Sequence, residues 1–206
     1  MDIFFLKGLV LGFSVAAPVG PIGVLCIQRS LTRGFWAGFV SGLGATTADT
    51  MYGLIAAFGI TAVSTYMITQ ANLLGLAGGL FLCYLGVKTF KSKPAAAHVA
   101  DQSNSLIGAY ASTFALTITN PMTIIAFTLI FSGMGLANAS STTATSALMV
   151  LGVFTGSGLW WLLLTSGVSW LKDRFDASKM VWINRIAGVV ILIFGLLSLL
   201  KVLLSR

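Results

Sequence analysis

Acidic residues are scarce in this chain of 206 residues: it has five, and every one of them is Asp. Charged residues of both signs make up 8% of the composition, hydrophobic residues make up 57%, and the mean hydropathy is +0.96. A soluble domain is about one quarter charged, so these values exclude an ordinary soluble protein and indicate a membrane protein. The sequence has no nucleophile–base pair, metal-ligand cluster or phosphate loop, so we expect no enzyme and no cofactor.

Histidine and cysteine are also rare, with one His and two Cys in the whole chain. Cys26 and Cys83 both lie in apolar stretches and have no metal-ligand spacing. The net charge of +7 comes from Lys and Arg in short segments between apolar runs, which indicates membrane topology rather than nucleic-acid binding. The N-terminal segment lacks the basic start of a signal peptide, so we expect it to form a span of the mature protein.

Long apolar runs are what the chain has in abundance. Six of them are predicted to be transmembrane helices, at about residues 3–28, 35–59, 72–91, 106–134, 146–170 and 182–204. The connections between them are short, which predicts a single domain over residues 1–206 rather than several domains.

The distribution of Lys and Arg predicts the orientation of the chain in the membrane. Connections 1–2, 3–4 and 5–6 carry Arg29, Arg33, Lys88, Lys91, Lys93, Lys172, Arg174, Lys179 and Arg185, whereas only Lys7, Lys201 and Arg206 lie on the other side. By the positive-inside rule, these three connections are cytoplasmic and both termini lie outside. Trp36, Trp170 and Trp182 fall at the same predicted ends, as an interfacial aromatic belt would.

Glycine spacings predict an internal repeat. Gly8 and Gly108 each precede a proline by 13 residues, Gly38-x-x-x-Gly42-x-Gly44 corresponds to Gly152-x-x-x-Gly156-x-Gly158, and Gly79 with Gly86 corresponds to Gly188 with Gly195. Because each half holds three spans, the halves must be inverted with respect to each other. The predicted fold is therefore an all-α membrane protein of six transmembrane helices in two inverted three-helix repeats, at about 1–91 and 106–206, joined by a cytoplasmic loop at about 92–105. The two glycine ladders are predicted to be helix-packing surfaces, within the chain or between chains of a homo-oligomer.

Proline residues predict that helices 1 and 4 are broken. Pro18 and Pro21 interrupt the first span and Pro121 interrupts the fourth, where each removes a backbone hydrogen bond. Gly20-Pro21 and Asn120-Pro121 each have the form of an N-cap followed by proline at the first helical position. A half-helix N-terminus carries partial positive charge and can hold a substrate carboxylate near the membrane midplane. The alternative is a proline kink that only helps packing.

Asp49 lies near the middle of the apolar run at residues 34–59, whose 26 residues would span about 39 Å as a helix. An ionised Asp at the bilayer centre costs about 2.5–3.5 kcal/mol, so such a residue is a functional-site candidate. Thr46 and Tyr52 lie one turn away and are expected to share hydrogen bonds with the carboxylate. We hypothesise that a proton and a substrate ammonium compete for Asp49, which would exchange outgoing solute for an incoming proton. The alternative is a neutral structural Asp.

These motifs resemble the LysE/RhtB family of bacterial amino-acid exporters over nearly the whole chain. The resemblance implies six helices in the bacterial inner membrane and proton-linked efflux of amino acids or related small solutes. Two positions depart from the family pattern. The family's Pro-Gly-Pro is here Pro18-Val19-Gly20-Pro21, and the lysine that often follows Asn-Pro is here Met122, which removes a charge near the expected site.

The sequence also bears on two other transport functions. A divalent-metal exporter needs several carboxylate or imidazole ligands, and the predicted spans offer one Asp, no Glu and no His. A transmembrane thiol electron carrier needs two cysteines that meet, and Cys26 and Cys83 are not at equivalent repeat positions. A membrane protein that transports nothing would leave Asp49 and the two breaks unexplained. The expected partners are therefore a small amino-acid-like solute, protons and the lipid bilayer, with no bound metal.

Overall fold

The computed structural model describes residues 2–18, 20–58, 69–91, 105–120, 123, 127, 142–171 and 177–204. Within these ranges the regular elements are the helices α1 Asp2–Ala16, α2 Pro21–Arg33, α3 Phe35–Ala57, α5 Ala71–Phe90, α6 Leu106–Ile118, α8 Thr143–Leu171 and α9 Ala177–Leu204. No strand occurs in the described ranges. The predicted all-α class is confirmed for this part of the chain.

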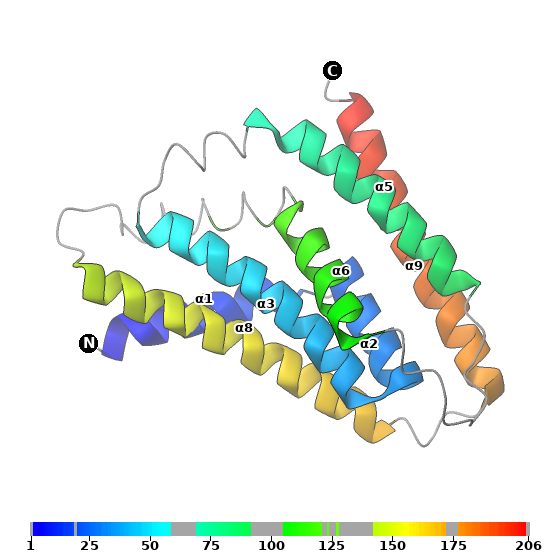
Figure 1. Cartoon of the computed structure of the whole chain (residues 1–206), viewed down its shortest axis with the longest axis horizontal. Helices are drawn as coiled ribbons and strands as arrows, with labels where there is room; N and C mark the ends of the chain where they lie inside the picture. Colours follow the sequence, from blue (N-terminus) through cyan, green and yellow to red (C-terminus); the bar gives the residue numbers. More distant parts are fainter. Residues whose placement is uncertain are drawn as a thin grey trace.

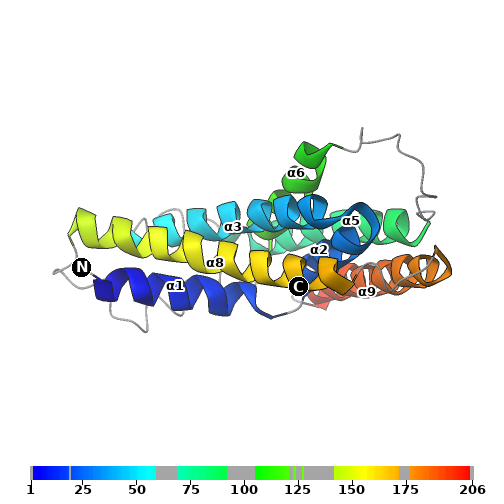
Figure 2. The ribbon, with the colours of Figure 1, turned by 90° about the horizontal axis from the view of Figure 1, so that it is seen from below.

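The helices form two groups joined by two short helices. Helices α1, α3 and α8 run alongside one another, α5 pairs with α9, and α2 and α6 lie between the two groups (Figure 1). Seen from below, α8 lies between α1 and α3 (Figure 2). Helix α3 packs against α2, α6 and α8, so it connects the first group to the two short helices.

Length and hydropathy qualify only some of these helices as membrane spans. Asn72–Phe90, Thr143–Leu171 and Val181–Leu204 are long and apolar enough, and the bent pair Ile3–Ala16 with Pro21–Arg33, inclined at 80°, would make a fourth span. Helix α3 is not among them, although the sequence predicts a span at about 35–59. Glycines and polar residues such as Asp49 lower its hydropathy, and α2, α6 and α8 pack against it.

Helix α2 runs further than the sequence predicts, because the first span was expected to end at about residue 28 whereas α2 continues to Arg33. The helix ends where Gly34 takes a φ of 92° and donates its N–H to the carbonyl of Ser30 at 3.0 Å. Glycine adopts this left-handed conformation without a steric penalty, so the end of α2 is determined by a local residue.

The glycine ladder of α8 lies directly against the backbone of α1. A Cβ atom built on Gly152 would lie 2.2 Å from the carbonyl oxygen of Phe5, and one on Gly156 would lie 2.0 Å from that of Leu9. No side chain fits at either position, so glycine is required for this close approach. The third member, Gly158, has more room, since the nearest atom to its Cβ would be 3.9 Å away.

The glycines of α3 face three different helices of the same chain. Gly38 lies against Ser30 of α2, Gly42 against Trp161 of α8, and Gly44 against the carbonyl oxygen of Tyr110 on α6. On α5 and α9, a Cβ on Gly79 or Gly86 would approach the carbonyl oxygens of Gly195 and Gly188, respectively. Each of these glycine contacts is therefore made within one chain.

Candidate functional site

Asp49 lies at the contact between α3 and α8, with 3% of its surface exposed. The hydroxyl of Ser157 on α8 donates to Asp49 Oδ2 at 2.8 Å, and Ser157 Oγ lies 3.2 Å from Thr46 Oγ1. Helix α8 approaches closely here because Gly42 and Gly53 of α3 face it. The only acidic group of α3 is thus held inside the protein by a serine hydroxyl.

The expected direct hydrogen bonds from Thr46 and Tyr52 to the carboxylate are wrong for the described structure. Thr46 contacts Ser157 instead, and Tyr52 donates its hydroxyl to the carbonyl of Ile118 and, at 3.5 Å, to that of Thr117. Tyr52 therefore ties α3 to the C-terminal end of α6. Helical spacing puts Thr46, Asp49 and Tyr52 on about the same face of α3. In the structure, Ser157 of α8 is the partner of Thr46, and carbonyl groups at the end of α6 are the partners of Tyr52.

The first break separates α1 from α2. The last helical turn of α1 closes with the N–H of Ala17 donating to Phe13 O at 2.9 Å, and Pro18 follows outside the helix. Gly20 is the N-cap of α2 and Pro21 is its first residue. Gly20 has no side chain to accept from the first-turn N–H groups, so the partial positive charge of this N-terminus is left without a side-chain cap.

The second break follows α6, which ends at Ile118. The N–H of Asn120 donates to Thr117 O at 3.1 Å, and the carbonyl of Asn120 accepts from the N–H of Thr123, also at 3.1 Å. Asn120 therefore lies between the end of α6 and Thr123, which is itself helical. Pro121, the proline predicted to cause this break, lies outside the described residues.

The two breaks meet at one pocket, here called the break pocket, of about 360 Å³. Its lining includes Pro21 from the start of α2 and Thr119 and Asn120 from the end of α6, together with Leu82, Phe194 and Lys201 from α5 and α9. A volume near this size can enclose a small ligand. Asp49 does not line the break pocket, so the structure separates the carboxylate from the place where the breaks meet.

Sequence reasoning missed two residues of this region. Ser157 carries no signal beyond its position beside the ladder glycine Gly156, and Lys201 had been considered only as a topology marker. Trp161 packs on Gly42, and its buried indole Nε1 has no hydrogen-bond partner in the described part of the chain. Ser157 and Lys201 each lie beside residues that are distant in the sequence, so local patterns could not assign them.

A divalent-metal exporter would need a cluster of metal ligands, and a thiol electron carrier would need two cysteines that meet. Groups of three or more His, Cys, Asp or Glu that could hold a metal ion do not occur among the described residues. Cys26 is buried in α2 and Cys83 is half-buried on α5, and both are free thiols. A Cβ on Gly195 of α9 would lie 2.7 Å from the sulfur of Cys83, so this cysteine faces the α5–α9 contact.

Helices long and apolar enough to span a membrane indicate a helical membrane protein, and helices broken around a pocket are typical of solute carriers. Residues 13–201 match the family described as LysE type translocator, and the chain belongs to this family. The resemblance inferred from the sequence motifs is thereby confirmed.

Two bacterial relatives match over most of their length. The chain is 31% identical over 195 residues to "Putative amino acid efflux protein YcgF" of Bacillus subtilis (strain 168), which covers 93% of this chain and 92% of that protein. It is 25% identical over 174 residues to "Uncharacterized membrane protein YahN" of Escherichia coli (strain K12), which covers 82% of this chain and 77% of that protein. No solved structure matches the chain significantly.

Proposed function

We propose that this protein exports amino acids from the cytoplasm in exchange for protons. Membership of a translocator family supports transport, and the name of the Bacillus subtilis relative supports an amino acid as the solute. The observation that carries the proposal is the break pocket, which brings together Pro21 and Asn120 from opposite halves of the sequence.

The break pocket suits the two charged groups of an amino acid. The N-terminus of α2 at Gly20 and Pro21 carries partial positive charge, and the Lys201 side chain adds a full positive charge. The C-terminus of α6 beside Asn120 carries partial negative charge. The substrate carboxylate is held at the start of α2 and the ammonium at the end of α6, while the side chain packs on apolar walls such as Phe194.

Asp49 is the proton site in this proposal, and the solute occupies the break pocket. The geometry favours this division over competition for a single carboxylate, since Asp49 is buried and does not line the break pocket. Ser157 and Thr46 form its hydrogen-bond network. Tyr52, one helical turn from Asp49, bonds to carbonyls at the end of α6, and so links the proton site to the break pocket.

The proposed architecture has six spans in two inverted repeats within one domain, located in the bacterial inner membrane. The packing pairs support it, because exchanging the two halves converts the α1–α8 contact into the α6–α3 contact and leaves the α3–α8 and α5–α9 pairs unchanged. The predicted orientation has connections 1–2, 3–4 and 5–6 in the cytoplasm and both termini outside. In such carriers the two repeats move around a site at their interface.

The test is an exchange assay in proteoliposomes with a panel of labelled amino acids, with and without a pH gradient. In wild type, the pH gradient should drive net transport of the amino acid. Without the gradient, wild type should still exchange labelled for unlabelled amino acid. Asp49→Asn should abolish gradient-driven transport and keep solute exchange, because it keeps the shape but removes the titratable group.

The matched control is Thr50→Val, on the same helix, whose hydroxyl donates to the carbonyl of Thr46 as its one hydrogen bond among the described residues. It should retain both activities. Full gradient-driven transport by Asp49→Asn would reject the proton role of this residue. Loss of both activities in correctly folded Asp49→Asn would instead favour a shared site for proton and substrate.

A further inference from the structure

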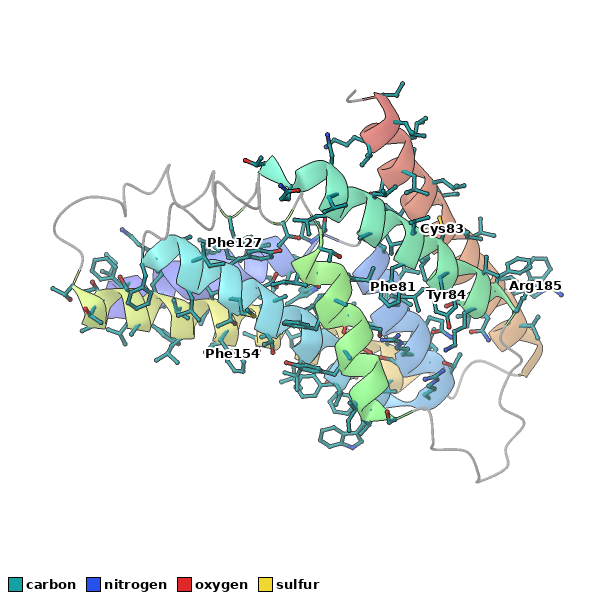
Figure 3. All side chains as sticks on the ribbon, turned by 45° about the horizontal axis from the view of Figure 1, so that its top comes forward. Phe81, Cys83, Tyr84, Phe127, Phe154 and Arg185 are labelled. Carbon is teal, nitrogen blue, oxygen red and sulfur yellow. The ribbon has the colours of Figure 1, made fainter. Side chains whose placement is uncertain are left out.

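A second pocket, here called the basic pocket, lies where α2 and α5 end and α6 begins. Its volume is about 480 Å³, and Phe81 and Tyr84, labelled in Figure 3, line it from α5. Arg29 and Arg33 line it from α2 and Lys88 lines it from α5. The arrangement of Lys and Arg predicts that this end of the molecule faces the cytoplasm.

The described side chains that line the basic pocket give it a positive charge. Arg29, only 8% exposed, donates from Nη1 to Ser41 Oγ at 2.8 Å and to the carbonyl of Ala109 at 2.9 Å, and from Nη2 to Ser112 Oγ at 2.8 Å. These uncharged partners hold the guanidinium without neutralising it. No acidic residue is among the described residues that line the pocket. The pocket therefore attracts anionic groups and repels cations.

The break pocket and the basic pocket lie along the same three helices. On α2, Ile22 lines the break pocket and Leu25 lines the basic pocket. On α5, Leu82 lines the first and Leu85 lines the second. On α6, Leu116 lines the break pocket and Ser112, one turn earlier, lines the basic pocket. The two pockets are therefore successive along all three helices.

A compact apolar cluster lies between them. Leu25, Leu82, Leu85, Leu116 and Ile191 pack together, each with 8% or less of its surface exposed, and we call this cluster the leucine layer. A close-packed apolar layer excludes water and charged solutes, so it closes the route from one pocket to the other.

We propose that the basic pocket and the break pocket are the two ends of one solute pathway, closed by the leucine layer, that selects carboxylate-bearing solutes and rejects cationic amino acids. This inference rests on the proposed function. The positive groups at both ends, Lys201 in one pocket and three cations in the other, attract a carboxylate. A solute such as lysine carries a second ammonium group, for which neither pocket offers a described acidic partner. The transported class is thus amino acids of zero or negative net charge.

The selectivity test is competition in proteoliposomes that exchange labelled leucine, with unlabelled leucine, glutamate or lysine added on the cytoplasmic face. Leucine and glutamate should compete at least about tenfold better than lysine, as electrostatic steering of this size predicts. The measured ratio is the potency of lysine as a competitor divided by that of leucine. The double variant Arg33→Glu with Lys88→Glu should raise this ratio by about tenfold at low salt, and by less at high salt. Arg33 and Lys88 are both exposed, so these two substitutions should leave the fold intact.

The matched control is Arg185→Glu. Arg185 lies near the start of α9, labelled in Figure 3, is exposed, and lines neither pocket. It should leave the ratio unchanged. Lysine competing as well as leucine in wild type, or an unchanged ratio in the double variant, overturns the inference while leaving amino-acid export standing. Failure of wild type to exchange any amino acid overturns the proposed function and this inference together.

The leucine layer has a separate test, which measures leak of labelled leucine down its gradient with no exchange partner. Leu82→Ala with Leu116→Ala should raise the leak, since removing two buried side chains opens a cavity in the barrier. The control Leu80→Ala changes a side chain of α5 that is 56% exposed, and it should not leak. Equal leak rates for both variants would show that the layer is not the barrier.

Discussion

At the scale of single residues, the molecule depends on how it holds charge in its apolar interior. Asp49 is 3% exposed, and its described hydrogen-bond partner is the hydroxyl of Ser157, on a different helix. Arg29 is bound by two serine hydroxyls and a carbonyl. Buried charges need hydrogen-bond partners, because an unsatisfied charged group costs several kcal/mol. In these described contacts, hydroxyl and carbonyl groups supply the hydrogen bonds without adding an opposite charge.

Ser157→Ala removes the donor to the Asp49 carboxylate. We expect the free energy of unfolding in detergent to fall by about 1–2 kcal/mol, because a buried acceptor is left without its partner. Ser169→Ala is the control on the same helix. The Ser169 hydroxyl is buried without a hydrogen-bond partner in the described part of the chain, so its loss should change stability by less than about 0.5 kcal/mol. Thermal unfolding curves compare the two variants, and equal losses would contradict the role of the Ser157 bond.

At the scale of helices, glycine determines which pairs come into contact. Helix α8 lies against the backbone of α1 at Gly152 and Gly156, and the α5–α9 pair meets at four glycines. The hydrophobic effect does not drive such contacts in a lipid environment, so close backbone packing is a main source of stability there. The glycine patterns in the sequence thus correspond to helix pairs in the structure.

Gly152→Ala should destabilise the α1–α8 pair. The added methyl group would lie 2.2 Å from the carbonyl oxygen of Phe5, so the helices must separate, at a cost of about 1–3 kcal/mol. Gly167→Ala is the matched control, because a Cβ at this position of α8 meets nothing within 4 Å. It should be neutral or slightly stabilising through helix propensity. Unfolding measurements that find the two variants equally stable would contradict the packing role of Gly152.

At the scale of the whole molecule, the break pocket and the basic pocket lie toward opposite ends of the helices. The basic pocket is formed by the end of α5 and the start of α6, whereas Lys201, near the end of α9, lines the break pocket. The excess of Lys and Arg predicts that the first of these ends is cytoplasmic. The orientation therefore decides which pocket a cytoplasmic solute reaches first.

The orientation can be measured by thiol labelling in a background of Cys26→Ser and Cys83→Ser. Ser105→Cys and Thr142→Cys each introduce a thiol at an exposed position, at the start of α6 and just before α8. A membrane-impermeant maleimide added to intact spheroplasts should label the Thr142→Cys variant, and should label the Ser105→Cys variant only after lysis. The opposite pattern would invert the topology and assign the basic pocket to the outer face.

Features that depend on neighbours along the chain could be predicted from the sequence. The third span was expected at about 72–91 and α5 is Ala71–Phe90, because the length of an apolar run and its flanking polar residues define a span. Gly20 and Pro21 start α2 as expected, since proline has no N–H to donate and suits a first helical position. The class of protein followed from composition and these motifs, and the family match agrees with it.

Only the tertiary structure decided which groups meet. Asp49 was expected to bond to Thr46 and Tyr52 on its own helix, and instead it accepts from Ser157, 108 residues away. Lys201 was counted as a topology marker, and it lines the same pocket as Pro21. These contacts depend on the rotation and approach of α8 and α9, which are set by glycine contacts between helices distant in sequence. Local periodicity determines a helix and its apolar face, but the partner of a buried charge is chosen by the packing of the whole molecule.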